Sequence, residues 1–200
     1  MEALYKEMGL VANKVFDNET FKNVSFSEDE LAGKEFDGCV FINCNFLNCY
    51  FSGTGFIDCR FESCDLSLVK FSNTGLRDIV FSGCKLTGTD FSGCNSSFLS
   101  FTFEKCVLDL ASFMKMKIRK TLFTSCSLRE ADFSEADLTD SEFRECDLHR
   151  TIFRNTILER ANLRTAIKYS IDPERNKIKQ AVFSLNGLPG LLEKYNIVIT

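Results

Sequence analysis

The chain has 200 residues, with 24 lysines and arginines against 28 aspartates and glutamates, which gives a formal net charge of −4. A negatively charged protein is repelled by DNA and by anionic membranes, so we expect neither as a direct partner. Phenylalanine occurs 21 times, whereas tryptophan is absent and tyrosine occurs 4 times. This bias indicates that one aromatic side chain fills a repeated structural position.

The first segment, residues 1–13, carries charges at short intervals and has no apolar run typical of a signal peptide. No window of the chain approaches the roughly 18 apolar residues of a membrane-spanning helix. We therefore expect a short lead-in to a cytoplasmic protein, in a compartment where thiols are kept reduced.

From residue 14 to residue 168 a large apolar side chain recurs every five residues. The series starts at Phe16 and Phe21, and a smaller residue, such as Ala131 or Thr151, stands two positions before the large one. A period of five fits neither a helix nor a flat strand. It fits a chain that turns a corner every five residues, so that four pentads close a square coil and residue n stacks on residue n+20.

The columns of like residues at n+20 are continuous only if two residues are inserted once, between about 92 and 106. The series then resumes at Phe98 and Phe103, although Phe101 competes for the same positions. We expect a loop there, and a second irregularity at residues 27–34.

The ten cysteines occupy the small inward position of this repeat. The spacing between stacked coils, about 4.8 Å, would allow disulfides, but neighbouring side chains in a column point in parallel. A C-x4-C series along a line is also unlike zinc-binding spacing. We interpret the cysteines as packing residues, with redox or metal chemistry as the alternative. Six of them form one column: Cys44, Cys64, Cys84, Cys106, Cys126 and Cys146.

Catalysis is not expected, and we predict no cofactor and no metal. The only histidine, His149, falls at an outward position, and no nucleotide-binding motif is present. The sequence therefore favours a binding protein over an enzyme.

A run of acidic residues covers nearly one full coil. It has two interpretations, a solvated surface or a partial mimic of DNA phosphates that steers the rod into a basic groove. Because one coil distributes its outward positions over four sides, the run should form a belt. Its members are Glu130, Asp132, Glu135, Asp137, Asp140, Glu142, Glu145 and Asp147.

In the last segment, residues 169–200, the repeat fades. Apolar residues at helical spacing predict a short helix, and residues 196–200 predict a terminal strand. The open end of a β-helix exposes unpaired strand edges, so capping alone would explain this segment.

The stretch LREADFSEADLTDSEFRECDL resembles the pentapeptide-repeat family. The resemblance implies an all-β fold, a right-handed quadrilateral β-helix. Three stretches look more specifically like the family's topoisomerase-poison resistance group, which includes AlbG, McbG, Qnr and MfpA, with AlbG nearest. They are FESCDLSLVKFSNTGLRDIVFSGCKL, SFTFEKCVLDLASF and the tail from Tyr169 onwards.

This narrower resemblance implies a non-enzymatic protein that binds DNA gyrase, with topoisomerase IV as a further candidate, and protects it from poisons. The alternative is a scaffold or adaptor for another protein. The acidic belt and the loop residues Asn95, Ser96, Ser97 and Ser100 would contact the partner. The resemblance also implies a homodimer through Leu185, Leu188, Leu191, Leu192, Tyr195, Ile197, Val198 and Ile199.

Overall fold

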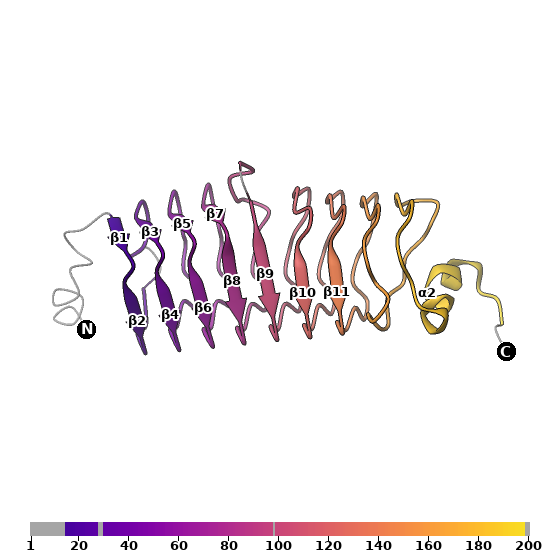
Figure 1. The fold of residues 1–200 in the computed structure, drawn as a ribbon, viewed down its shortest axis with the longest axis horizontal. Coiled ribbons are helices and arrows are strands. Elements are labelled where there is room, and N and C mark those ends of the chain that lie inside the picture. The colour runs from indigo at the N-terminus through magenta and orange to yellow at the C-terminus, as the bar shows by residue number, and fades with distance from the viewer. Residues whose placement is uncertain (1–14, 28–29, 98, 199–200) are drawn as a thin grey trace.

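The computed structural model describes residues 15–27, 30–97 and 99–198. The chain winds into a rod of stacked coils whose strands are all parallel (Figure 1). A four-stranded sheet on one side contains β1 (Val15–Asp17), β3 (Glu35–Asp37), β5 (Gly55–Ile57) and β7 (Gly75–Arg77). A seven-stranded sheet contains β2 (Thr20–Lys22), β4 (Val40–Ile42), β6 (Arg60–Glu62), β8 (Ile79–Ser82), β9 (Phe101–Glu104), β10 (Leu122–Thr124) and β11 (Glu142–Arg144). The predicted parallel β-solenoid is confirmed.

The pairing register agrees with four five-residue repeats in each coil, so that residue n pairs with residue n+20. Phe16 pairs with Phe36 and Phe21 pairs with Phe41, each 20 residues apart. Isolated parallel bridges, such as Lys70 with Asp90, hold the other sides of the coil. We call each coil of the rod a rung. Since every rung is hydrogen-bonded to its neighbours, the rod is a continuous backbone ladder.

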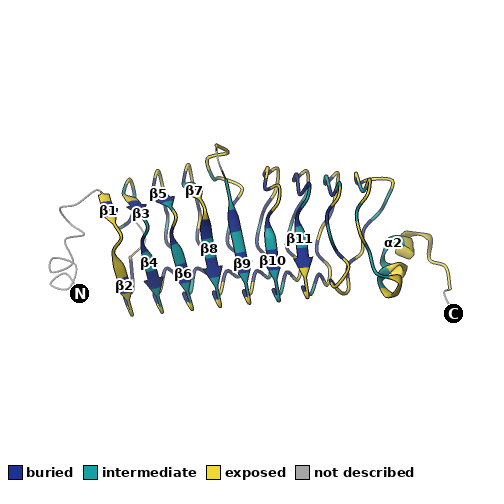
Figure 2. Cartoon of the chain, viewed as in Figure 1, coloured by how far each residue is buried: buried dark blue, intermediate teal, exposed yellow. Residues whose placement is uncertain are grey.

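The core is a ladder of phenylalanine rings inside the coil. Along the seven-stranded sheet, the ring centroid of Phe123 lies 5.1 Å from that of Phe103 and 4.9 Å from that of Phe143. Figure 2 shows buried positions alternating with intermediate or exposed ones along the strands, with most of the turns exposed. Burying one such ring stabilises the fold by about 1.5–3 kcal/mol, which explains the selection of a single aromatic residue.

Most corners place a residue in the left-handed region, two positions after the large residue. Asn18 has φ 53°, and even Arg150 adopts φ 58°. Asparagine and glycine tolerate this conformation best. At Gly38 (φ 60°) a Cβ atom would lie 2.4 Å from Oδ1 of Asn18 on the neighbouring rung, so any other residue there would have to displace the Asn18 side chain.

The two extra residues lie between Asn95 and Phe101. The amide of Asn95 still donates to the carbonyl of Thr74, 2.9 Å away, whereas Ile79 pairs with Phe101, 22 residues later. The connection between β8 and β9 consequently rises above the row of turns (Figure 1). Phe98 lies outside the described residues.

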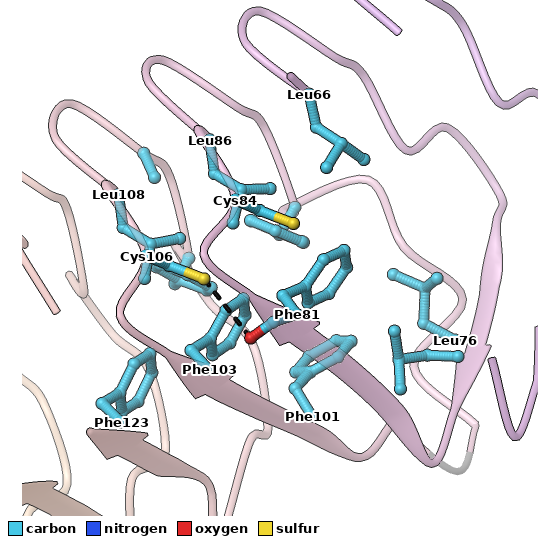
Figure 3. Close-up of a cluster of buried hydrophobic side chains, with 14 of the residues drawn as sticks. Leu66, Leu76, Phe81, Cys84, Leu86, Phe101, Phe103, Cys106, Leu108 and Phe123 are labelled. Atoms are coloured by element: carbon cyan, nitrogen blue, oxygen red, sulfur yellow. Dashed lines mark hydrogen bonds between the residues drawn. The ribbon is translucent and has the colours of Figure 1, made fainter. Parts of the chain in front are cut away.

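Phe101 and Phe103 divide the two inward positions between them. Phe103 takes the large position, and its ring stacks on that of Phe81 with centroids 5.2 Å apart. Phe101 takes the small position in register with Ile79, where it is buried beside Phe91 (Figure 3). This insertion therefore places an unusually large residue in a small position.

The coil keeps its register around residues 27–34. Ser25 bridges Asn45 and Val15 pairs with Glu35, both at the ordinary distance of 20 residues. Leu31 is buried in the large position, and residues 28 and 29 lie outside the described part.

The packing interpretation of the cysteines is confirmed. All ten are free thiols, buried except for the half-buried Cys94. Each thiol of the six-membered column lies against a carbonyl oxygen of the preceding rung, as Cys106 does on Phe81 at 3.3 Å (Figure 3). Thr89 places its hydroxyl in the same way, 2.8 Å from the carbonyl oxygen of Leu66. The small position therefore accepts any compact side chain, and Cys, Thr and Ser add a hydrogen bond to the ladder.

The C-terminal segment closes the rod with η1 (Leu185–Gly187), α2 (Pro189–Leu192) and η2 (Glu193–Tyr195). The expected helix is thus a single turn flanked by two 3-10 turns. The expected terminal strand is not formed by residues 196–198, because neither Ile197 nor Val198 has a backbone hydrogen bond to a neighbouring strand. No helix in the described part of the chain is long and apolar enough to cross a membrane.

Candidate partner-binding surfaces

The acidic belt is largely neutralised by basic side chains of neighbouring rungs. Asp137 is buried and pairs with Arg119, whose Nη2 lies 2.6 Å from its Oδ2. Burial opposes ionisation of Asp137, but hydrogen bonds from Arg119 and Thr139 outweigh it and hold its pKa below the usual range. Asp147 pairs with both Arg129 and Lys168. Both carboxylates are therefore already ion-paired with basic side chains of this chain.

Other members of the belt are also occupied. Ion pairs join Glu142 to Arg144, Asp140 to Arg160, and Glu130 to Arg150. Within the described residues, Asp132, Glu135 and Glu145 form no ion pair; Asp132 accepts from the amide of Ser134 and Glu145 accepts from the hydroxyl of Ser125. The belt encircles the rod and does not concentrate negative charge on one side.

A second acidic feature, which the sequence analysis did not single out, lies along one corner. Asp17 and Asp37 end β1 and β3 and are paired in register, while Asp58 and Asp78 directly follow β5 and β7. All four are exposed, and none forms an ion pair with a described residue. We call these four residues the aspartate ridge. The four carboxylates lie on successive rungs but in two adjacent columns, because Ile57 and Arg77 continue the column of Asp17 and Asp37. Reading the outward columns at n+20 would have found the pairs Asp17 with Asp37 and Asp58 with Asp78, each about 4.8 Å apart along the rod.

The projecting loop stands directly after this ridge. Asn95, Ser96 and Ser97 are exposed, and Oδ1 of Asn95 accepts from the amide of Ser97 at 3.1 Å. The hydroxyl of Ser100 accepts from the amide of Asp78 and donates to its carboxylate, both at 2.7 Å. Ser100 therefore anchors the loop to the ridge, and the other three predicted residues form its accessible tip.

The C-terminal segment presents apolar side chains beyond the last rung. Leu191 packs half-buried against the core, and Ile199 lies outside the described residues. The remaining predicted dimer residues are exposed: Leu185 85%, Leu188 42%, Leu192 36%, Tyr195 51%, Ile197 56% and Val198 90%.

The body of this segment is firmly seated. A Cβ atom at Gly190 would lie 2.1 Å from the carbonyl oxygen of Tyr169, so the chain passes too close for any other residue. Lys194 bonds Asp172 and Glu174, each at 2.7 Å. The exposed side chains are thus carried by an anchored cap.

His149 is exposed on the outside of the coil. Within residues 15–27, 30–97 and 99–198, no group of His, Cys, Asp and Glu side chains is arranged to hold a metal ion.

Solved structures with the same fold include two trypsin-treated forms of QnrB1, a plasmid-mediated fluoroquinolone resistance protein. Each is 19% identical to this chain, with TM-scores of 0.56 and 0.57, and the matches cover 93% and 92% of this chain and 100% and 99% of QnrB1. Full-length QnrB1 is 21% identical with a TM-score of 0.47, and the match covers 92% of this chain and 100% of QnrB1.

No curated protein matches this sequence. The family model for the pentapeptide repeat region matches residues 34–102 and 96–167, which is more than half of the chain. The chain belongs to the pentapeptide repeat family.

Proposed function

We propose that this protein is a non-enzymatic ligand of DNA gyrase that protects the enzyme from topoisomerase poisons, with topoisomerase IV as a second target. The observation that carries the proposal is the aspartate ridge: one exposed carboxylate on each of four successive rungs, in two adjacent columns, without ion partners among the described residues. The fold shared with QnrB1, over nearly the full length of both chains, supports the same assignment.

In this proposal the ridge imitates a line of DNA phosphates. Duplex DNA carries one charge per about 3.4 Å of each strand, compared with one ridge carboxylate per rung of about 4.8 Å. A basic groove that grips DNA would attract such a line of carboxylates and raise the rate of association. The unpaired members of the acidic belt, Asp132, Glu135 and Glu145, would add to the field.

The loop and the cap complete the interaction. Asn95, Ser96 and Ser97 project beside the ridge and offer hydrogen-bonding groups to the enzyme. A homodimer through the exposed residues of the cap would double the length of the rod. Membership of the AlbG, McbG, Qnr and MfpA group is part of this proposal.

A scaffold function for another protein is the second candidate, and one corner of the rod favours it. Leu68 and Leu110 adopt left-handed φ angles of 59° and 62° and are exposed, at 52% and 58%. Leucine is unfavourable in this conformation, and neither side chain is buried in the core. A partner protein that covers this corner would bury both leucines, which lie in one column with Gly88 between them.

A gyrase supercoiling and cleavage assay with the purified protein, with and without poisons, tests the proposal. The wild type should reduce poison-dependent cleavage. A ridge variant with Asp17, Asp37, Asp58 and Asp78 changed to asparagine should bind gyrase more slowly and with a weaker salt dependence. The matched control changes four ion-paired acids, Glu130, Asp140, Glu142 and Asp147, to their amides. The absence of any wild-type effect on either topoisomerase would favour the scaffold.

A further inference from the structure

One side of a single rung is strongly basic. Lys115, Lys117, Arg119 and Lys120 lie within six residues of sequence, and all are exposed. We call Lys115, Lys117 and Lys120 the lysine band. It is the first complete rung after the projecting loop, and residues 91–103 before it contain no aspartate or glutamate.

The positive charge of the lysine band is not neutralised, because most neighbouring acids already form ion pairs with arginines. Asp137, which bridges Lys117 in the backbone ladder, takes its ion pair from Arg119. Asp140, one rung beyond Lys120, is held by Arg160 through two hydrogen bonds of 2.6 and 2.9 Å. None of the three lysines forms an ion pair with a described residue. Two adjacent carboxylates stay outside these pairs: Glu135, next to Lys115 in the following rung, and Asp78, in a hollow beside Lys120.

A hollow adjoins the band at Lys120. It has a volume of about 280 Å³ and lies between Lys120 and the residues that return from the loop. At its other end lies the carboxylate of Asp78, which accepts a hydrogen bond from Ser100 and keeps its negative charge. An acidic partner segment would therefore contact Lys120 at the rim and would not fill the hollow. The lining consists of Asp78, Ile79, Val80, Ser100, Phe101, Thr102 and Lys120.

The size and surroundings of the band select the kind of partner. It is one rung tall, with the aspartate ridge on one side and the acidic belt on the other. A DNA duplex or an anionic membrane would extend over the aspartate ridge and the unpaired acids of the belt, Asp132, Glu135 and Glu145, and be repelled. A few carboxylates on one loop or helix end of a protein would contact the lysines alone.

We propose that the lysine band and the adjoining loop bind a short acidic segment of a partner protein. The contact has the opposite charge to the aspartate ridge, so the rod presents two complementary surfaces on either side of its loop. Such a pair of surfaces fixes the orientation and register of the rod on its partner.

Fluorescence anisotropy of a labelled hexaglutamate peptide, with the full chain, tests this inference. The wild type should bind the peptide in a salt-dependent manner, and Lys115→Gln, Lys117→Gln and Lys120→Gln combined should weaken binding about tenfold. The matched control, Lys22→Gln, Lys70→Gln and Lys105→Gln, removes the same charge from exposed lysines elsewhere and should change binding less than about twofold.

No peptide binding by the wild type, or an equal loss in both triple variants, would overturn the inference. Equal or tighter binding of a short DNA duplex would also overturn it and identify a nucleic-acid surface. Circular dichroism establishes that each variant is folded, and single Lys117→Gln, expected to lose about twofold, replaces the triple variant if that one is not. These measurements contain no topoisomerase, so their outcome is independent of the proposed function.

Discussion

The phenylalanine ladder should dominate the stability of the rod, and Phe123→Ala measures it. The ring of Phe123 is fully buried and stacks on Phe103 and Phe143, with edge contacts to Phe113 and Phe133 at 6.1 and 6.0 Å. Truncation removes the transfer free energy and leaves a cavity between two rungs that cannot close, because the backbone ladder holds them apart. Together these effects should cost about 3–5 kcal/mol.

The assay is urea unfolding followed by far-ultraviolet circular dichroism. Phe123→Leu is the matched control, since leucine fills the same position at Leu163 in this column, and it should cost about 1–2 kcal/mol. Phe16→Ala should also cost less than Phe123→Ala, because Phe16 stacks only on Phe36 within the described rungs. Equal losses for Phe123→Ala and Phe123→Leu would refute the view that stacked rings hold the rungs together.

Three further predictions concern the small position, the paired acids and the cap. Cys84→Ser, which keeps a donor for the carbonyl oxygen of Phe61, should retain more stability in urea than Cys84→Ala, expected to lose about 1 kcal/mol; the reverse order would contradict the hydrogen-bond argument. The lowered pKa of Asp137 means that its contribution to stability is present above the unfolded value of about 3.9 and is lost as pH falls through the native value. Asp137→Asn and Arg119→Gln should therefore both flatten the fall in melting temperature below about pH 4. An unchanged dependence of the melting temperature on pH in this range would contradict the prediction. Leu185→Asp with Val198→Asp should convert a wild-type dimer to monomer in sedimentation experiments while Val15→Asp at the other end does not, and a monomeric wild type would refute the dimer.

The amino-acid sequence by itself determined the repeat and what it encloses. A period of five, a small residue two positions before a large one, and likeness at n+20 depend only on local spacing. The stacking of Phe103 on Phe123 and the burial of the cysteine column follow from them. The loop between 92 and 106 could also be predicted, because columns on either side of it would otherwise fall out of register.

Only the tertiary structure decided which surface charges remain free. Arg119 and Asp137 are 18 residues apart, and Asp140 and Arg160 are 20 apart, so their pairing depends on closing the coil and on the reach of each side chain. The acidic belt, prominent in the sequence, is thereby largely neutralised, whereas the scattered aspartates of the ridge and the lysine band keep their charge. Similarly, Phe101 and Phe103 are both phenylalanines, so the sequence alone did not say which takes the small position and which the large one. The backbone pairing of Phe101 with Ile79 and of Phe103 with Phe81 decided it. Packing repeats every five residues and can be read along the chain, but electrostatic pairing acts between rungs and is set in three dimensions.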